Sequence, residues 1–396
     1  MERLLPLSDL VVLDLTRARS GPSATRMLAD WGADVIKIQE PATDGVPPEE
    51  MGGGWQSSDF QNLNRNKRSL SLNLKEDEGR LIFLKLVESA DIVVENYRPD
   101  VKHRLGVDYE ACKAVNPRII YGSISGFGQS GPYFQRPGLD QIAQGMGGLM
   151  SVTGIPGQGP IRAGVAIADL SAGAFLVQGI LIALHERGRT GEGQWVHTSL
   201  LEAQIGMMDF QAVRWLTDGE VPPQAGNDHP TMMPTGVFPT SDGYLNIQAT
   251  SNALFKKLCD AIGAADVLGN PGYASVGERS KNRRPLVDEI AEYTKRGSTA
   301  QWLEVLNAAG IPCGPIYTVD KTFADPQVQH LGMVMEAHQP KLGELHLLTP
   351  PYSLSDSRPR QARMPAPAHS QHTDDILASL GYDAAAIDDL RARRIV

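Results

Sequence analysis

The chain has 396 residues, of which 41% are hydrophobic and 21% charged, a balance typical of a globular protein with a sizeable core. Its formal net charge of -9 at pH 7 argues against nonspecific nucleic-acid binding as the main role. Any anionic ligand must therefore meet a local basic cluster. The 40 glycines and 27 prolines predict many loops and tight turns rather than a helical bundle.

The three cysteines, Cys112, Cys259 and Cys313, lie far apart and show neither zinc-ligand spacing nor a disulfide framework, so we expect no metal. The first nine residues lack the basic start and long apolar core of a signal peptide. The longest apolar run, 170–184, is shorter than the roughly 20 residues that a membrane-spanning helix needs. These features predict a cytoplasmic protein with no membrane partner.

Residues 10–126 alternate short β-rich runs with helical patterns. The predicted strands are 10–16, 33–38, 91–95 and 118–124. The predicted helices are 23–31, 76–89 and 109–115. Such alternation indicates a parallel sheet with crossover helices, on which ligands collect at the carboxyl ends of the strands.

Asp169 directly precedes the apolar run 170–184, which predicts a buried helix. Aspartate is a favoured N-cap residue, so capping of this helix is one interpretation. The residues around it are unusually small: Gly164, Ala166, Ala168, Ala172, Gly173 and Ala174. Backbone or ligand can therefore approach the carboxylate closely, and a functional carboxylate is the second interpretation.

The pattern changes after a predicted helix at 200–217, which follows a glycine turn and a strand. Short strands and amphipathic helices beyond it predict a smaller α+β domain, joined through a polar, turn-rich linker. The predicted division of the chain is a large domain at 1–217, a linker at 218–234, the small domain at 235–327, and a return to the large domain with a C-terminal tail at 328–396.

Residues 126–131 match the GxGxxG pattern of dinucleotide-binding proteins, directly after a predicted strand. Its glycines must open a helix whose N-terminus holds the pyrophosphate. Pro132 and Pro137 interrupt any such helix, which argues against a dehydrogenase. The sequence contains no P-loop (GxxxxGKS/T), no HExxH zinc-hydrolase motif and no GxSxG serine-esterase motif. A carboxylate nucleophile needs no general base, because an aspartate of ordinary pKa is already ionised at neutral pH.

Two basic clusters are suited to a ligand that carries phosphate groups. The window 61–75 contains no acid and carries four cations, Arg65, Lys67, Arg68 and Lys75. A solvated basic loop is the other interpretation of this window. The second cluster, Arg98, Lys102 and Arg104, follows the strand that ends at 95, where an open α/β sheet places its ligands.

A set of motifs in this order and spacing resembles the class III CoA-transferase family, also called CaiB/BaiF, whose members include formyl-CoA transferase. The motifs are VLDLT at 12–16, SGP at 20–22, ADVIKI at 33–38, NRNKRS at 64–69, DIVVEN at 91–96, RPGLD at 136–140, Asp169 and TGEGQ at 190–194. The resemblance covers nearly the whole chain. It implies an α/β fold with a Rossmann-like parallel-sheet large domain, a smaller α+β domain and an interlocked homodimer.

The resemblance also implies a reaction and a site. Asp169 matches the family's catalytic aspartate, which transfers CoA between an acyl-CoA and a carboxylic acid through mixed anhydrides and an aspartyl-CoA thioester. Coenzyme A and acyl-CoA are then substrates, and no permanently bound cofactor is expected. The matching CoA contacts are Arg19, Lys75, Asn96, Arg98 and Arg104, followed by Arg136 and Asp140.

Departures from two related branches narrow the expected activity. The α-methylacyl-CoA racemase branch needs a histidine where this chain has Leu139, which cannot exchange a proton. The formyl-CoA:oxalate members carry a histidine where Arg17 stands and an arginine where Glu40 stands. We therefore expect a larger acid, a dicarboxylate such as succinate, with Arg17 and His229 on its distal carboxylate. The alternatives are a racemase-like enzyme and a non-catalytic CoA-binding dimeric scaffold.

Overall fold

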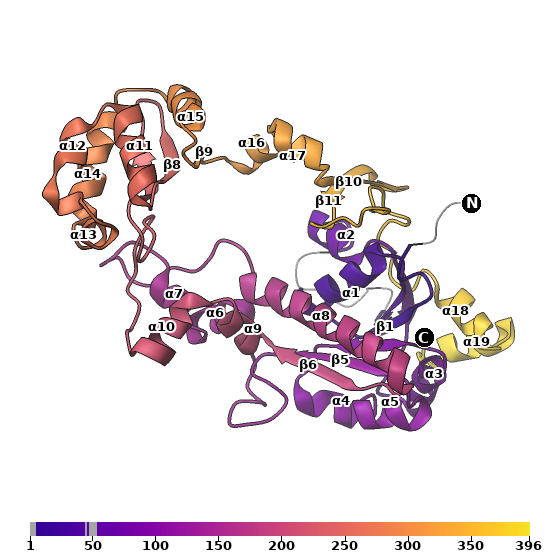
Figure 1. Cartoon of the computed structure of the whole chain (residues 1–396). Helices are drawn as coiled ribbons and strands as arrows, with labels where there is room; N and C mark the ends of the chain where they lie inside the picture. Colours follow the sequence, from indigo (N-terminus) through magenta and orange to yellow (C-terminus); the bar gives the residue numbers. More distant parts are fainter. Residues whose placement is uncertain (1–4, 44–45, 47–53) are drawn as a thin grey trace. The chain divides into compact units, whose positions relative to one another are not determined.

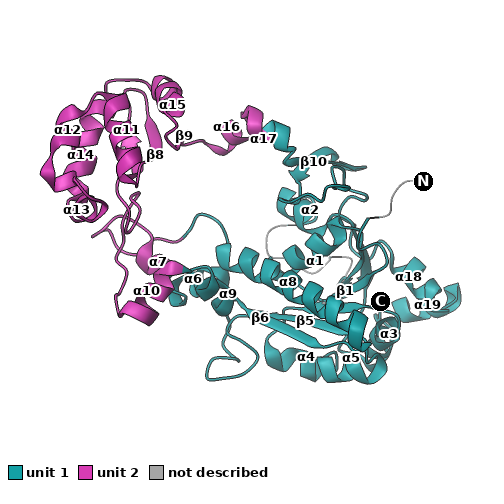
Figure 2. Ribbon diagram, viewed as in Figure 1, with its two compact units in different colours: residues 1–148, 163–209, 329–396 teal, residues 149–162, 210–328 magenta. Residues whose placement is uncertain are grey.

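The computed structural model describes residues 5–43, 46 and 54–396. The chain forms two compact units (Figure 2). Unit 1 comprises residues 1–148, 163–209 and 329–396, and unit 2 comprises residues 149–162 and 210–328. Unit 1 is therefore assembled from three stretches of sequence, between which the two stretches of unit 2 are inserted.

Unit 1 is built on a six-stranded sheet in which every neighbouring pair of strands is parallel, as the alternating pattern predicts (Figure 1). The spatial order is β3-β2-β1-β4-β5-β6. The strands are β1 (Val11–Asp14), β2 (Asp34–Gln39), β3 (Lys67–Ser71), β4 (Ile92–Glu95), β5 (Ile120–Ser125) and β6 (Trp195–Ser199). Strand order reverses between β1 and β4, and at such a switch point the loops diverge and leave a crevice.

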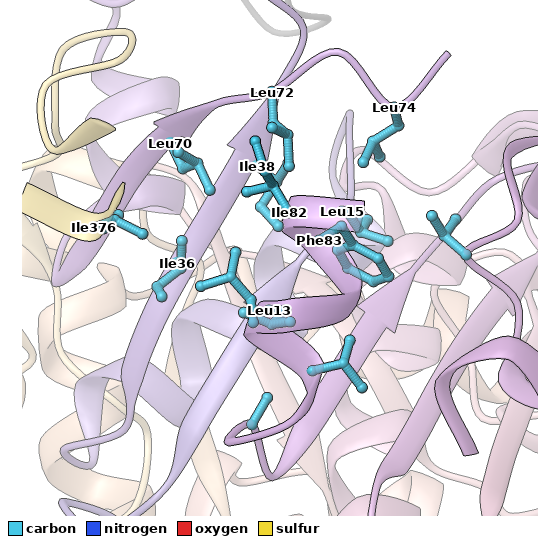
Figure 3. Close-up of a cluster of buried hydrophobic side chains, with 14 of the residues drawn as sticks. Leu13, Leu15, Ile36, Ile38, Leu70, Leu72, Leu74, Ile82, Phe83 and Ile376 are labelled. Atoms are coloured by element: carbon cyan, nitrogen blue, oxygen red, sulfur yellow. The ribbon is translucent and has the colours of Figure 1, made fainter. Parts of the chain in front are cut away.

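Helices cover both faces of this sheet, because successive strand residues point to opposite sides. Val12 packs in a cluster with residues of the helices α1 (Ser20–Asp30), α8 (Ile167–Thr190) and α9 (Leu200–Gly206). Leu13 packs in the other cluster, whose helices include α3 (Asp77–Val87), α5 (Tyr109–Val115), α18 (Thr373–Ser379) and α19 (Ala384–Ala392). Figure 3 shows Ile376 of α18 beside the strand residues of that second cluster.

The basic window 61–75 contains a strand, β3, and neither interpretation of Arg65, Lys67 and Arg68 from the sequence is correct. The Arg65 side chain is fully buried and its Nη2 lies 2.7 Å from the Asp30 carboxylate. Lys67 is also fully buried, with its Nζ 3.0 Å from Asp14. Arg68 pairs with Asp34 on β2. Arg65 and Lys67 neutralise buried acids inside the fold, since an unpaired buried charge is strongly destabilising, whereas the pair of Arg68 and Asp34 is only partly buried.

The apolar helix α8 is longer than predicted from the sequence. It has 24 residues and ends where Gly191 adopts a left-handed conformation (φ 79°). In its charged last turns Arg187 donates to Asp91 and to the Arg118 carbonyl. Among the described residues α8 is the one helix long and apolar enough to cross a membrane by length and composition. One side of α8, including Leu176 and Ile180, packs in the core of unit 1.

The last stretch of unit 1 returns to the edge strand β3. The Ser69 amide donates to the His372 ring, and the Asn73 amide donates to the Ile395 carbonyl. An antiparallel pair, β10 (Val334–Gln339) and β11 (Gly343–Leu348), precedes this return. Arg65 donates to the Leu348 carbonyl and so joins that pair to the buried ion pair. The remaining helices of unit 1 are α2 (Ser58–Asn64), α4 (Pro99–Leu105) and α6 (Asp140–Met146).

Unit 2 has a three-stranded antiparallel sheet, β7 (Thr235–Pro239), β8 (Tyr244–Gln248) and β9 (Cys313–Pro315). Its core combines Phe238 and Leu245 of the sheet with Leu258 and Ile290 of the helices. Its helices include α7 (Leu149–Val152), α10 (Phe210–Asp218), α11 (Asn252–Ile262), α12 (Ala265–Gly269), α13 (Val276–Lys281), α14 (Arg283–Thr294), α15 (Thr299–Ala308) and α16 (Val319–Ala324). A further helix, α17 (Pro326–Leu331), begins in unit 2 and ends in unit 1.

Candidate active site

A cavity of about 350 Å³ opens at the switch point of the parallel sheet. Its polar wall comes from the segments that follow β1, β2, β3 and β4. These residues are Arg17, Glu40, Lys75, Asn96, Arg98 and Arg104. Four of the predicted CoA contacts therefore line one cavity together with Arg17, at the edge of the sheet where ligands of such folds bind.

Asn96 shapes this cavity by joining two of the loops. The Arg17 amide donates to the Asn96 Oδ1 over 2.9 Å, and the Asn96 Nδ2 donates to the Arg17 carbonyl over 2.7 Å. Both polar atoms of the Asn96 amide thus bond to the backbone of Arg17. We infer that Asn96 holds the loop after β1 against the loop after β4, while the cations provide the charge.

Glu40 is the cavity residue whose role the sequence did not reveal. Its carboxylate accepts a 3.0 Å hydrogen bond from Arg17 Nη2, and Lys75 Nζ lies 3.4 Å away. Partial burial alone would raise the pKa of Glu40, but the hydrogen bond and charge of Arg17 together with Lys75 outweigh burial and hold that pKa below its ordinary value. A negative charge is therefore fixed among cations suited to phosphate.

Asp169 lies inside the first turn of α8 as its third residue, so it is not the N-cap that its place before the apolar run suggested. The residue at the N-cap is Ala166, whose side chain makes no capping hydrogen bond. Burial raises the pKa of Asp169, the negative charge of Asp140 raises it further, and Arg19 opposes them, which leaves a pKa of about 6. A partly buried carboxylate with a strongly shifted pKa is a functional-site candidate.

Two close contacts fix what surrounds this carboxylate. A Cβ at Gly173 would lie 2.7 Å from the Ser20 carbonyl oxygen, so only glycine allows α8 to approach the start of α1 this closely. Arg19, at the N-cap of α1, pairs with Asp59 through two hydrogen bonds of 3.0 and 2.6 Å. The predicted CoA contact Arg19 therefore acts electrostatically on Asp169 and is not among the residues that line the cavity.

The other predicted contacts lie on the segment after β5. Arg136 places its guanidinium over the rings of Tyr133 and Phe127, 4.5 and 5.4 Å from their centres. Residues 126–139 contain no helix, so the glycine motif has no helix N-terminus for a pyrophosphate. Asp140 begins α6, and both of its carboxylate oxygens accept hydrogen bonds from protein groups.

His229 belongs to unit 2. Its Nδ1 accepts hydrogen bonds from the Thr231 and Met232 amides over 3.2 and 3.1 Å, which places the proton of the neutral ring on Nε2. The ring stacks on Phe210 at 5.9 Å. In the described ranges, 5–43, 46 and 54–396, no group of three or more histidine, cysteine, aspartate or glutamate side chains is arranged to hold a metal ion.

Comparisons with known proteins identify the family of this chain. The sequence profile of "CoA-transferase family III" matches residues 7–373. Human succinyl-CoA:glutarate CoA-transferase is 35% identical over 400 residues, covering 100% of this chain and 91% of the relative. Succinate–glutarate CoA-transferase of Agrobacterium fabrum is 36% identical over 95% of this chain and 96% of its own length.

A solved structure gives the same result at the level of the fold. The crystal structure of a CAIB/BAIF family protein from Brucella suis superimposes with a TM-score of 0.82 at 34% identity, covering 96% of this chain and all of that chain. The protein is therefore an α/β enzyme of the CoA-transferase class. It belongs to CoA-transferase family III, the CaiB/BaiF family, as its sequence motifs predict.

Proposed function

We propose that this enzyme transfers CoA from succinyl-CoA to a second dicarboxylate through a covalent intermediate on Asp169. The observation that carries the proposal is the partly buried Asp169 carboxylate, with a pKa of about 6, on the first turn of α8. At neutral pH roughly nine-tenths of such a group is ionised, while it remains more basic than an ordinary aspartate. An anionic carboxylate of raised basicity suits attack on a thioester carbonyl.

The names of the relatives support a dicarboxylate. They include the succinyl-CoA:glutarate and succinate–glutarate enzymes and the succinyl-CoA:mesaconate CoA-transferase of Haloarcula marismortui, 36% identical over 95% of this chain. Glutarate and mesaconate are both five-carbon dicarboxylic acids. We propose an acceptor of this size.

The cavity at the switch point is the proposed site for the phosphates of CoA. Arg17, Lys75, Arg98 and Arg104 surround it with four cations, each more than half exposed, so a phosphate can reach them. Guanidinium and ammonium groups form strong, charge-assisted hydrogen bonds with phosphate oxygens. This local basic cluster can bind an anionic substrate although the net charge of the chain is negative.

The proposed reaction conserves the energy of the thioester through four steps. The Asp169 carboxylate attacks the acyl carbonyl of the donor, the C–S bond breaks, and a mixed anhydride and CoA thiolate form. The thiolate attacks the aspartyl carbonyl and releases the donor carboxylate, which leaves an aspartyl-CoA thioester. The acceptor carboxylate opens that thioester to a second anhydride, and the thiolate then attacks the acceptor's acyl carbonyl and frees Asp169.

The test is an exchange assay combined with trapping of the intermediate. Enzyme incubated with succinyl-CoA and a series of four- to six-carbon dicarboxylates should form new CoA thioesters, and mass spectrometry should find CoA attached to the peptide that contains Asp169. Asp169→Ala should abolish both. Asp388→Asn, on α19 at the other face of the sheet, is the matched control and should retain both.

The outcomes of this assay separate the proposal from its alternatives. Exchange that survives Asp169→Ala refutes the covalent mechanism. Solvent deuterium at the α-carbon without new thioesters would identify a racemase-like enzyme instead, although the apolar Leu139 offers no second acid/base group. CoA binding without either reaction would identify a scaffold.

We also propose that the enzyme is an interlocked homodimer of the cytoplasm. Apolar side chains of α6, α8 and α9 lie exposed on unit 1, and large exposed apolar patches mark interaction surfaces. They include Ile142, Met146, Phe175, Leu181, Ile182 and Ile205. Light scattering after size-exclusion chromatography should give twice the mass of one chain, and a monomer would refute the dimer.

A further inference from the structure

Two side chains of α6, Asp140 and Gln144, bind the backbone that leads into α8. The Asp140 Oδ1 accepts hydrogen bonds from the amides of Ala168 and Asp169, over 2.9 and 3.2 Å. Its Oδ2 accepts from the Gln144 Nε2 over 2.6 Å. Gln144 is fully buried, and its Oε1 accepts a 2.9 Å hydrogen bond from the Ala163 amide. One turn of α6 therefore fixes residues 163–169.

These contacts supply the cap that α8 lacks. The first amides of a helix have no partner within the helix, and a side chain at the N-cap usually accepts from them. Ala166 stands at that position and cannot do so. The carboxylate of Asp140 replaces the missing cap from another helix, and one of the two amides that it holds belongs to Asp169 itself.

We propose that Asp140, held in place by Gln144, is a positioning residue that fixes the first turn of α8 and thereby aims the attacking carboxylate of Asp169. The inference rests on the proposed function, because it assigns Asp140 a task in the reaction of Asp169. It also differs from a role in CoA binding, since both oxygens of Asp140 are engaged within the protein.

The charge of Asp140 also shifts the pKa of Asp169, and this shift can be measured. Asp140 raises the pKa of Asp169 after burial, and Arg19 opposes it. The charged groups that act on the Asp169 carboxylate are Asp140 of α6 and Arg19 at the N-cap of α1. Charged residues on or beside the other elements packed against α8 have partners elsewhere: Arg26 and Asp30 of α1 pair with each other, Asp91 pairs with Arg187, and His197 contacts the Trp195 ring on the opposite face of β6. The side of β5 that faces α8 presents none, and Glu202 is bonded to the Ser199 hydroxyl. Asp140 is therefore the charge to neutralise.

The decisive variant is Asp140→Asn. Its Oδ1 can still accept from both amides, but its Nδ2 faces the Nε2 of Gln144, so two donors oppose each other. We expect the kcat of exchange to fall at least about tenfold while the KM for acyl-CoA changes less than about twofold, since misplacing a nucleophile by a fraction of an ångström slows the reaction more than it weakens binding. The acidic limb of the pH–rate profile should move down by about half a unit or more, because a like charge is gone.

The double variant Asp140→Asn with Gln144→Glu tests the same point if the single variant does not fold. A glutamate at 144 accepts from the asparagine and from the Ala163 amide, which restores these two contacts while the charge moves one helical turn away. Only the longer 3.3 Å bond from the Gln144 Nε2 to the Val165 carbonyl is lost. The double variant should recover most of the kcat and keep the shifted acidic limb. Asp383→Asn, which alters the N-cap of α19 instead, should change neither quantity.

Three results would overturn the inference. They are an unchanged kcat in Asp140→Asn, a rise in KM alone as expected of a CoA contact, or a slower enzyme whose acidic limb stays in place, as expected of a purely structural residue. The proposed function is tested separately by Asp169→Ala. If that variant loses exchange and Asp140→Asn does not, only the positioning role fails; if Asp169→Ala keeps exchange, the covalent mechanism fails first.

Discussion

Replacing Glu40 by glutamine should tighten CoA binding. The carboxylate of Glu40 pairs with Arg17 over 3.0 Å and with Lys75 over 3.4 Å, within the cavity proposed for the CoA phosphates. A phosphate that enters must compete with Glu40 for both cations and is repelled by its charge. Glutamine keeps the size of the side chain and removes the charge, so the cations become available to the ligand.

The magnitude follows from the exposure of these groups. The side chains of Arg17 and Lys75 are 58% and 66% exposed, so solvent screens their charges and a dielectric constant near that of water applies. At roughly 6 Å in that medium one unit charge repels another by about 0.7 kcal/mol. Releasing two exposed ion pairs contributes up to about 1 kcal/mol more, since such pairs are individually weak. We expect CoA to bind about 5- to 20-fold more tightly, because 1.4 kcal/mol corresponds to tenfold.

Titration calorimetry with CoA, on the wild type, Glu40→Gln and Glu40→Asp, measures this effect. The aspartate variant keeps the charge and serves as the control. The gain should shrink as salt is raised from about 50 to 300 mM, because ions screen exposed charges. Weaker binding by Glu40→Gln would refute the reasoning, because it would mean that Glu40 orders Arg17 and Lys75 for the ligand rather than competing with it.

Three further changes test other parts of the structure. Lys67→Met leaves Asp14 buried without its nearest cation and should lower the free energy of unfolding by about 3 kcal/mol in a urea titration; a loss below about 1 kcal/mol would contradict the pairing. Gly193→Ala would place a Cβ 2.0 Å from the Ile119 carbonyl oxygen and should lower the melting temperature by several degrees, at a cost of about 1–3 kcal/mol; an unchanged melting temperature would show that the backbone yields freely. For Asp169, whose pKa is raised to about 6, protonation removes the nucleophile, so kcat/KM should be constant above pH 7 and fall about tenfold per unit below pH 6; a profile that stays flat to pH 5 would contradict the raised pKa.

Local patterns were sufficient to predict most of the parallel sheet. The helix expected at 109–115 is α5 with the same bounds, and the apolar runs around Val12, Val35 and Val93 are central strands. The edge strand β3 escaped prediction because Lys67 and Arg68 interrupt any apolar or alternating pattern. The charge of Lys67 is neutralised by Asp14, 53 residues away in the sequence, and no local window contains such a pairing.

In the candidate site, too, some residues could be predicted from the sequence and others could not. Cations that follow strand ends could be predicted, because parallel strands bring their carboxyl ends to one edge; Lys75, Arg98 and Arg104 lie at this cavity. The engagement of Asp140 could not be predicted, since it depends on how α6 meets the start of α8. In the sequence Glu40 is an ordinary acid after a strand. Its effect on the cavity comes from its pairing with the two cations Arg17 and Lys75, which only the structure shows.

The return of the chain to β3 constrains how the protein is made. Ser69 and its partner His372 are 303 residues apart, and the whole of unit 2 is synthesised between them. During translation the growing chain must therefore keep its edge strand and the apolar surface around Leu70 unprotected until α18 emerges from the ribosome. Contacts of such sequence separation slow folding and expose aggregation-prone intermediates. We therefore expect the nascent chain to be most prone to aggregation, and to depend most on chaperones, before α18 has been synthesised.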